Sequence, residues 1–336
     1  MRRIPSLDGL RAISVMLVIL GHLQRRNLIY IPFFGDYALL GVRIFFVLSG
    51  FLITNLLLHE QECTKTISLR EFYIRRAYRI FPAAAVYLAI ASLFFWRETP
   101  WYQIAIAALY MANMASGLHW SFGHLWTLSI EEQFYLLWPF VLRRWHKNKI
   151  AILIAVSIAA PFFQTLMLAL HIHRNLLPGY ADQLATGCLL AIFAPRLPKI
   201  KGYVGLAMAA AIFLIPGFPA VTASRTVFEL FVLNPLLNIS IAGVVLHVID
   251  SPYGFLNWTP VAWVGKISYS LYLWQEIFCY NPKLHYGYFL ILPCLGCASL
   301  SYYLVEQPML RLRDKRTRKV KGLPKGTVQP EAASVA

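Results

Sequence analysis

The chain has 336 residues, of which 58% are hydrophobic and 14% are charged. Soluble domains carry about 25% charged residues, and a chain of this size cannot bury so much apolar surface in a water-soluble globule. The composition therefore excludes a soluble protein and indicates an integral membrane protein. Lysine and arginine outnumber aspartate and glutamate by 31 to 15, but the basic residues lie between apolar runs and in the C-terminal tail, where they specify membrane topology. We expect no binding of nucleic acid.

Ten apolar runs meet the test for crossing a bilayer, which takes about 20 residues, or somewhat fewer where the bilayer thins. They cover residues 7–24, 38–58, 80–96, 128–143, 150–171, 180–195, 202–219, 227–249, 262–280 and 286–307. The first run follows Met1-Arg2-Arg3 as in a signal peptide, but no small-residue cleavage site comes after it, so we expect a retained helix. A further run at 101–115 is short and is flanked by Pro100 and Gly117.

Positive charge decides whether the run at 101–115 crosses. The segments 59–79, 143–149 and 196–201 and the tail from Arg311 are rich in lysine and arginine, which marks cytoplasmic segments. If 101–115 crossed, the segments at 143–149 and 196–201 would face outside. We therefore predict an all-α polytopic bundle of about ten transmembrane helices in a bacterial inner membrane. In this prediction 101–115 is a re-entrant or peripheral segment, and both termini are cytoplasmic.

The prediction contains one folded domain. Residues 1–314 form the transmembrane domain, with no internal repeat and no second soluble domain. Residues 315–336 are rich in Lys, Arg, Pro and Gly and end in small residues, a composition typical of disorder. We expect a disordered basic cytoplasmic tail that can rest on anionic lipid headgroups.

The five cysteines do not form a metal-binding pattern. Four of them lie within apolar runs, and Cys294 with Cys297 has no second thiol pair or histidine pair nearby. We interpret the cysteines as small buried hydrophobic residues. The sequence accordingly predicts no metal site.

The first helix carries three ionisable residues, Asp8, Arg11 and His22. Charges inside a membrane are costly and usually face a cavity with a function. Arg11 and His22 are eleven residues apart, about three turns or about 16 Å, so they share one face, with His22 nearer the outer end. Asp8 can pair with Arg11 on that face, and a plain interfacial ion pair explains those two residues equally well. His22 is the better catalytic candidate, since imidazole titrates near neutral pH and can accept a proton from a hydroxyl.

Two clusters and one small-residue pair are further candidates. Ser49-Gly50 lies within the second helix, where small residues admit either another backbone or a ligand. Arg75, Arg76 and Arg79 gather in the loop before the third apolar run, with Pro82 expected at the head of the helix. The arginines set the orientation, and Arg76 and Arg79 would lie side by side on a helical turn and could clamp a diphosphate.

Adjacent carboxylates, Glu131 and Glu132, stand at the expected outer start of the fourth helix. Capping and the helix dipole explain one of them. Because adjacent helical residues point about 100° apart, we expect at most one carboxylate to face a cavity. That carboxylate could orient or activate a histidine at the same level, either His22 or His124, although we interpret His124 as a structural hydrogen-bonding residue.

Taken together, these segments resemble the acyltransferase 3 family of bacterial membrane proteins. The matching stretches are Leu7-Asp-Gly-Leu-Arg-Ala-Ile with His22, Phe45-Phe-Val-Leu-Ser-Gly-Phe-Leu-Ile-Thr54, Arg75-Arg-Ala-Tyr-Arg-Ile-Phe-Pro82, His124-Leu-Trp-Thr-Leu-Ser-Ile-Glu-Glu-Gln-Phe-Tyr-Leu-Leu-Trp-Pro139, Ile267-Ser-Tyr-Ser-Leu-Tyr-Leu-Trp274 and Val305-Glu-Gln-Pro-Met-Leu-Arg311. They extend from residue 5 to about residue 313, nearly the whole chain. The spacing between Arg11 and His22, together with the block around Glu131, is specific to the family.

The resemblance implies an enzyme that takes an acetyl or other acyl group from cytoplasmic acyl-CoA. The acceptor it implies is a hydroxyl of an envelope carbohydrate, such as O-antigen, exopolysaccharide or a lipid-linked glycan. Arg11 and His22 match the family's paired functional residues, with His22 as the base, and the arginines of the Arg75–Pro82 stretch match its acyl-CoA-side motif. The partners expected are acyl-CoA, the glycan acceptor and membrane lipids.

Three positions depart from the family's pattern. Arg43 stands where the family commonly has an aspartate, Tyr78 interrupts its Arg-x-Arg pattern, and Gln275 follows Trp274 where a histidine is common. The alternative function is a transporter or lipid-linked sugar flippase without covalent chemistry, which also uses ionisable residues inside the membrane. The sequence shows neither two similar halves nor a recurring pair of broken segments, which such a transporter would favour.

Overall fold

The computed structural model describes residues 4–31, 37–172, 175–215, 227–251, 253–279 and 287–321. Within these ranges the regular structure is helical, and none of them contains a strand. Seven longer helices form most of the bundle: α1 (Pro5–Arg25), α2 (Tyr37–Thr64), α3 (Leu69–Phe94), α6 (Trp126–Arg144), α7 (Lys149–Ala169), α11 (Asn234–Asp250) and α16 (Gln307–Lys321). The shorter helices are α4 (Trp101–Ala108), α5 (Trp120–Gly123), α8 (Ala181–Phe193), α9 (Gly202–Leu214), α12 (Gly254–Asn257), α13 (Thr259–Lys266), α14 (Ser268–Cys279) and α15 (Ile291–Ser301).

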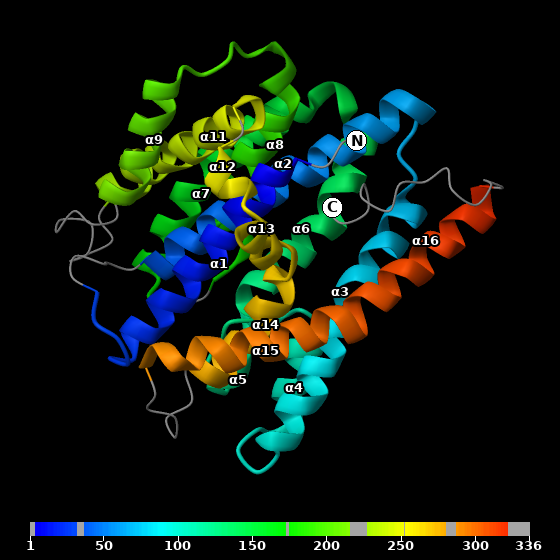
Figure 1. Cartoon of the computed structure of the whole chain (residues 1–336). Coiled ribbons are helices and arrows are strands. Elements are labelled where there is room, and N and C mark those ends of the chain that lie inside the picture. Colours follow the sequence, from blue (N-terminus) through cyan, green and yellow to red (C-terminus); the bar gives the residue numbers. More distant parts are fainter. Residues whose placement is uncertain are drawn as a thin grey trace.

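Short turns connect or extend these helices. The 3₁₀ turns are η1 (Ala112–Met114), η2 (His146–Asn148), η3 (Leu177–Gly179), η4 (Ala194–Arg196) and η6 (Gly287–Leu290). Two π-helical turns are η5 (Glu229–Leu233) and η7 (Tyr302–Glu306). Because η7 joins α15 to α16 without a break, the C-terminal part of the described chain is one long helix that lies beside α3 and α14 (Figure 1).

Helix α1 lies in the interior and packs against α2, α12, α13 and α14. Its apolar side chains Val15, Val18 and Ile19 are fully buried. The position follows from the sequence, because α1 is apolar around most of its circumference, as expected of a helix surrounded by others. Arg11 and His22 on this helix are therefore inside the bundle.

Helices α2 and α8 approach each other most closely at glycine. A Cβ atom on Gly50 would overlap the carbonyl oxygen of Leu184, and one on Gly187 would overlap the carbonyl oxygen of Val47. Small residues permit such close contact between helices in a membrane. Of the two interpretations of the Ser49-Gly50 pair, packing applies to Gly50, whereas Ser49 points toward a pocket.

Six helices are long and apolar enough to cross a membrane within the described ranges. They are Pro5–Arg25, Tyr37–Thr64, Leu69–Phe94, His146–Ala169, Glu229–Asp250 and Gly287–Thr317. The other four predicted spans correspond to α6, α8, α9 and α14, which are shorter or more charged. Helix α8, for example, has 13 residues, about 20 Å, whereas the hydrocarbon core is about 30 Å thick. A multi-pass membrane protein is confirmed, and the ten crossings remain a prediction.

The third helix begins earlier than we predicted. Helix α3 starts at Leu69, with Ser68 as a capping residue that accepts a hydrogen bond from the Glu71 amide. The expectation of a loop up to Pro82 was wrong, since Pro82 lies inside the helix. Hydropathy identified only the apolar half of a helix whose first turns are basic.

Two other predicted segments bear on topology. The segment 101–115 contains α4 and η1, and the eight residues of α4 extend only about 12 Å, too short to span a bilayer. Helix α16 continues to Lys321, so the first part of the expected disordered tail is helical. Residues 322–336 lie outside the described ranges.

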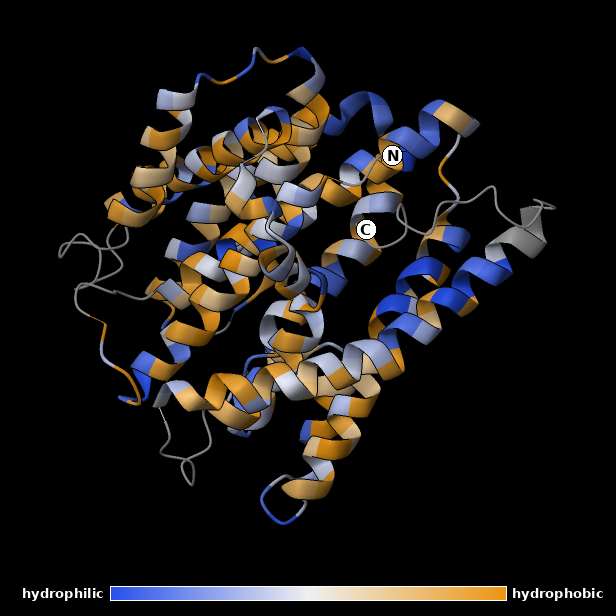
Figure 2. Cartoon of the chain, in the orientation of Figure 1, coloured by the Kyte–Doolittle hydropathy of each residue, from blue (hydrophilic) through white to orange (hydrophobic). Residues whose placement is uncertain are grey.

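Hydrophilic residues gather where α2 ends, α3 begins and α16 ends (Figures 1 and 2). The N-terminal end of the described chain lies on the same side of the molecule (Figure 1). These segments carry several of the lysines and arginines on which we based the predicted cytoplasmic side. The assignment of that side remains a prediction.

Candidate active site

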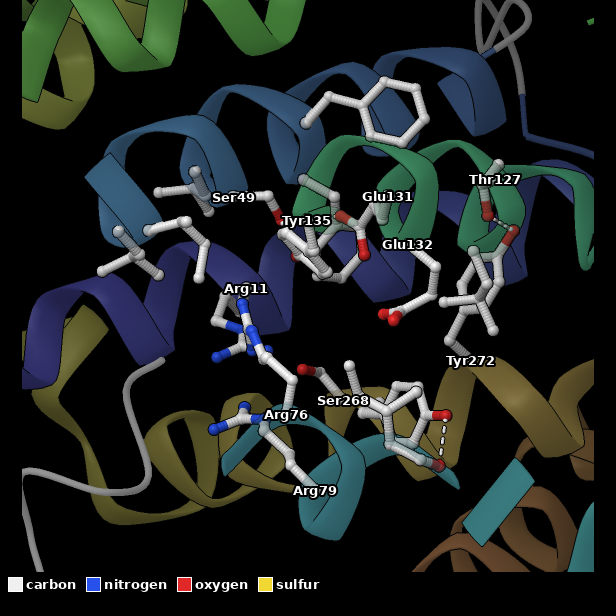
Figure 3. A pocket seen from close by; sticks show the side chains of 18 of the residues that line it. Arg11, Ser49, Arg76, Arg79, Thr127, Glu131, Glu132, Tyr135, Ser268 and Tyr272 are labelled. Atoms are coloured by element: carbon white, nitrogen blue, oxygen red, sulfur yellow. Dashed lines mark hydrogen bonds between the residues drawn. The ribbon is translucent and has the colours of Figure 1, made fainter. Parts of the chain in front are cut away.

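A pocket lies where α1, α2, α3, α6 and α14 converge (Figure 3). It has an empty volume of about 800 Å³, including the part open to solvent, within the range of small-molecule sites. Its polar and aromatic lining side chains include Arg11, Ser49, Arg76, Arg79, Thr127, Glu131, Glu132, Tyr135, Ser268, Tyr269 and Tyr272. Of the nine predicted site residues, six line this one pocket: Arg11, Ser49, Arg76, Arg79, Glu131 and Glu132.

Of the three predicted arginines, Arg75 points away from the pocket and toward the end of α2. Its Nη2 lies 2.8 Å from Glu60 Oε2, and Glu60 Oε1 accepts a hydrogen bond from the Ser68 amide. These contacts join the end of α2 to the start of α3. Arg75 is placed for a structural role, and it does not line the pocket.

Arg76 and Arg79 line the pocket together, as their spacing predicted (Figure 3). The Arg76 guanidinium carbon lies 4.1 Å from the centroid of the Tyr135 ring, a cation–π contact. Arg79 is buried, at 8% exposure. Two guanidinium groups at one wall supply the planar donors that bind phosphate oxygens in pairs.

Both adjacent carboxylates face the pocket, so our expectation of at most one was wrong. Ser49 Oγ donates a hydrogen bond to Glu131 Oε1 at 2.6 Å, and Tyr135 Oη donates to Ser49 Oγ at 3.1 Å. Arg76 interacts electrostatically with both Glu131 and Glu132. Both carboxylates therefore lie near Arg76, and Glu131 fixes the position of the Ser49 hydroxyl.

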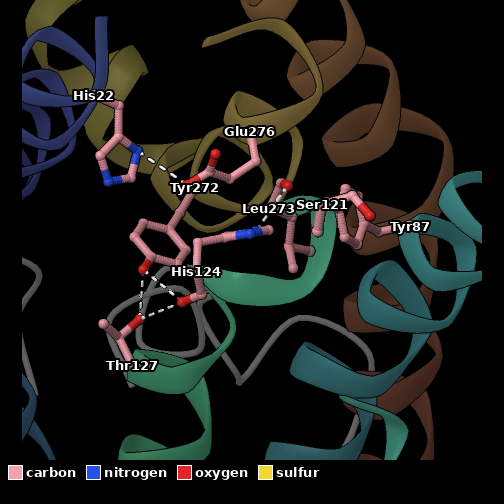
Figure 4. A network of polar contacts seen from close by, with 8 residues as sticks. All are labelled: His22, Tyr87, Ser121, His124, Thr127, Tyr272, Leu273 and Glu276. Carbon is pink, nitrogen blue, oxygen red and sulfur yellow. Dashed lines mark hydrogen bonds and ion pairs between the residues drawn. The ribbon is translucent and has the colours of Figure 1, made fainter. Parts of the chain in front are cut away.

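His22 is held by a carboxylate that the sequence analysis missed. His22 Nδ1 lies 3.2 Å from Glu276 Oε1 (Figure 4), with side-chain exposures of 15% and 7%. The predicted partner, Glu131 or Glu132, is replaced by Glu276 of α14 in this contact. Because Glu276 lies against Nδ1, the opposite nitrogen, Nε2, is the one placed to exchange a proton with a substrate.

Tyr272 connects the pocket with this His22–Glu276 pair. It lines the pocket, and it precedes Glu276 by four residues on α14, hence on the same helix face. Tyr272 Oη donates to the His124 carbonyl at 2.9 Å and accepts a hydrogen bond from Thr127 Oγ1 at 2.6 Å (Figure 4). His124 Nε2 contacts the Leu273 carbonyl at 3.2 Å, in keeping with its interpretation as a structural residue.

Asp8 and Arg11 have separate surroundings. Arg11 reaches the pocket and interacts electrostatically with Glu131 and Glu306. Asp8 is buried at 5% exposure, and its backbone lies against Gly265 of α13. Asp8 does not line the pocket.

Glu276 and Glu306 could have been found in the sequence. Both are ionisable residues within predicted spans, the criterion that selected His22. Glu306 is buried, forms a hydrogen bond with Ser270 and interacts electrostatically with Arg79. Tyr135 and Tyr272 had no such signal, because aromatic residues are common in membrane helices.

Two of the family departures lie away from the pocket lining. Arg43 donates hydrogen bonds to Asn238 Oδ1 at 2.9 Å and Asn234 Oδ1 at 2.7 Å, in a polar cluster between α2 and α11. Gln275 is fully buried on α14. Across the described residues, no group of three or more His, Cys, Asp or Glu side chains is arranged to hold a metal ion.

Comparison with known proteins gives the family. A family model described as an acyltransferase domain, that of the acyltransferase 3 family, matches residues 4–306. The chain is 31% identical over 313 residues to the peptidoglycan O-acetyltransferase OatA of Listeria monocytogenes, an alignment covering 81% of this chain and 49% of that protein. It is 32% identical over 320 residues to the O-acetyltransferase OatA of Staphylococcus aureus, covering 82% and 50%.

The chain thus spans about half the length of these curated relatives. None of the solved structures compared with it matches. The family match covers nearly the whole chain and includes each predicted site residue, from Asp8 to Glu132. The chain belongs to the acyltransferase 3 family of membrane acyltransferases.

Proposed function

We propose that this protein is a membrane O-acetyltransferase that uses acetyl-CoA from the cytoplasm and a hydroxyl of a cell-envelope carbohydrate. Both relatives described above are O-acetyltransferases by name, and one name specifies peptidoglycan. Peptidoglycan fragments are accordingly the first acceptor to test. O-antigen and exopolysaccharide have the same reacting group, a sugar hydroxyl, and are tested beside them.

The proposed donor site is the pocket. The diphosphate of coenzyme A would be bound by Arg76 and Arg79, and Arg11 lines the same pocket. Bidentate contacts between guanidinium and phosphate combine charge with fixed geometry. The thioester would extend past Tyr272, which forms the wall of the pocket nearest to Glu276 along α14.

The proposed base is His22. Its Nε2 takes the proton of the acceptor hydroxyl while the hydroxyl oxygen attacks the thioester carbonyl carbon. A carbon–oxygen bond forms, the carbon–sulfur bond breaks, and the coenzyme A thiolate leaves and receives the proton from His22. Glu276 orients the imidazole through Nδ1 and stabilises the positive charge that develops on the ring.

One observation supports this function best. Three arginines line a pocket to which helix α14 contributes Tyr272. One turn further along α14, Glu276 contacts His22. A phosphate-binding wall and a carboxylate-supported histidine are the two parts that acyl transfer from coenzyme A to a hydroxyl requires.

The test is acetyl transfer by the purified full chain in proteoliposomes. Free coenzyme A is measured with a thiol reagent, and O-acetylated product is measured by mass spectrometry with peptidoglycan fragments, O-antigen or exopolysaccharide as acceptor. We expect His22→Ala to abolish both signals and His59→Ala, at an exposed position on α2, to leave them unchanged. A His22→Ala protein with the wild-type rate would refute the role of His22. Glycan translocation by wild-type protein without release of coenzyme A would favour the transporter instead.

A further inference from the structure

Glu132 differs from its neighbour Glu131 in its contacts, although both line the pocket. Glu131 accepts a hydrogen bond from Ser49 Oγ. Within the described ranges Glu132 forms neither a hydrogen bond nor an ion pair, and Arg76 acts on it only electrostatically. Its side chain is partly exposed, and its carboxylate points into the pocket (Figure 3). Glu132 is therefore a pocket carboxylate that can accept a hydrogen bond from a ligand.

Helix α6 places Glu132 between the two ends of the pocket. At one end Thr127 Oγ1 donates a hydrogen bond to Tyr272 Oη, and at the other end the Tyr135 ring lies against Arg76. Glu132 follows Thr127 by five residues and precedes Tyr135 by three. These separations correspond to about 8 Å and about 5 Å along the helix axis. A ligand that extends from Arg76 to Tyr272 thus passes the level of Glu132.

The donor proposed above has hydrogen-bond donors at the matching place. The pantetheine arm of coenzyme A has the diphosphate at one end and the thiol at the other, with amide N–H groups and a hydroxyl between them. With the diphosphate on Arg76 and Arg79 and the thioester beside Tyr272, the amides lie along the middle of the pocket. A carboxylate there repels the phosphates and attracts N–H donors.

Bound coenzyme A would make this contact favourable. The arm would take the place of water around the Glu132 carboxylate, and a carboxylate that loses water without gaining a donor is destabilised. A hydrogen bond to a charged acceptor is also stronger than one between neutral groups. A ligand with an amide N–H at this level therefore binds better than a ligand that ends at the phosphates.

We propose that Glu132 accepts a hydrogen bond from a pantetheine amide N–H of the acyl-CoA donor and so distinguishes this donor from phosphorylated nucleotides without the arm. The inference rests on the proposed function, because it takes the pocket as the donor site. In this role Glu132 determines specificity and positions the arm, and His22 remains the base.

The experiment compares two ligands by isothermal titration calorimetry on the full chain in nanodiscs. One is coenzyme A, and the other is adenosine 3′-phosphate 5′-diphosphate, which has the corresponding phosphates and lacks the pantetheine arm. The measured quantity is the Kd of the nucleotide divided by the Kd of coenzyme A. We expect Glu132→Ala to lower this ratio by about tenfold, since one hydrogen bond to a charged group is lost. The loss of negative charge acts on the phosphates of both ligands, so that effect largely cancels in the ratio.

Glu306→Gln is the matched control. It removes the charge of a carboxylate that interacts with Arg79 but does not line the pocket. Both Kd values should change together, and their ratio should stay at the wild-type value. An unchanged ratio in Glu132→Ala would overturn the proposal. A fall in Glu306→Gln as large as that in Glu132→Ala would also overturn it, because general electrostatics would then explain the ratio.

Glu132→Gln decides the outcome if Glu132→Ala does not fold. Glutamine keeps the shape and one acceptor oxygen but loses the charge, so the ratio should fall by about threefold, and an unchanged ratio would overturn the proposal. Loss of acetyl transfer with an unchanged ratio would place Glu132 in the chemical step and would overturn it too. If wild-type protein does not bind coenzyme A, the donor site of the proposed function is refuted, and this inference with it.

Discussion

The contact between Arg76 and Tyr135 predicts a specific loss of donor binding. The guanidinium lies 4.1 Å from the ring centroid, and Tyr135 is 6% exposed, so the interaction is largely desolvated. A cation–π contact of this kind contributes about 2 kcal/mol. If the ring fixes Arg76 toward the phosphates of coenzyme A, Tyr135→Leu should weaken coenzyme A binding by about 30-fold.

Tyr135→Phe separates the ring from the hydroxyl. Phenylalanine keeps the aromatic face over which Arg76 lies and removes only the hydrogen bond to Ser49. A single hydrogen bond contributes about 1 kcal/mol, so binding should fall about fivefold at most. The larger loss in Tyr135→Leu is then due to the ring.

The measurement is the Kd of coenzyme A by isothermal titration calorimetry on the full chain in nanodiscs, with the thermal midpoint recorded for each variant. Phe134→Leu is the matched control, because the Phe134 ring stacks on Trp138 and does not line the pocket. Equal Kd values for Tyr135→Leu and Tyr135→Phe would refute the argument. A loss in Phe134→Leu as large as that in Tyr135→Leu would refute it too.

Four further variants test other contacts in the structure. Glu276→Gln should lower kcat for acetyl transfer by about 10- to 100-fold with little change in KM for acetyl-CoA. The control Glu62→Gln, at an exposed position of α2, should leave kcat unchanged. An unchanged kcat in Glu276→Gln would exclude Glu276 as the residue that positions His22. Arg75→Ala should lower the thermal midpoint slightly, since a partly exposed ion pair contributes about 0–1 kcal/mol, whereas Arg76→Ala should raise the Kd of coenzyme A. A raised Kd in Arg75→Ala with an unchanged Kd in Arg76→Ala would instead place Arg75 at the coenzyme A site. Gly50→Val should reduce the fraction of monodisperse protein in fluorescence-detected size-exclusion chromatography, because overpacking costs about 1–3 kcal/mol or more. The control Gly296→Val, where a Cβ meets no neighbour, should leave that fraction unchanged. Equal fractions for the two variants would contradict the close contact of α2 with α8.

The spacing of residues within a segment correctly predicted those features that are set by the geometry of a single helix. The spacing of Arg76 and Arg79 placed both side chains on one face, and both line the pocket. Each of the ten apolar runs contains a helix. The boundary of α3 was missed because hydropathy follows the membrane, whereas the helix begins at its cap, Ser68.

Contacts between distant segments were not predictable in the same way. Arg75 pairs with Glu60 of the preceding helix, and His22 contacts Glu276, which lies 254 positions later in the chain. Nothing in the spacing of either residue specifies its partner. Glu131 and Glu132 point in different directions from α6, yet both line the pocket. Several helices surround this pocket, so it extends around more than one face of α6.

Helix α14 is the element through which the two halves of the proposed reaction are aligned. Tyr272 at the pocket and Glu276 at His22 are four residues apart, about 6 Å along a rigid helix. The separation between the acyl group and the base is therefore set by helix geometry rather than by a flexible loop, and such preorganisation lowers the entropic cost of bringing reactants together. Tyr272 is itself fixed by Thr127 and by the His124 carbonyl, so its ring resists rotation away from the pocket wall. A change at Thr127 should thus act on kcat through Tyr272, although Thr127 has no contact with His22 in this network.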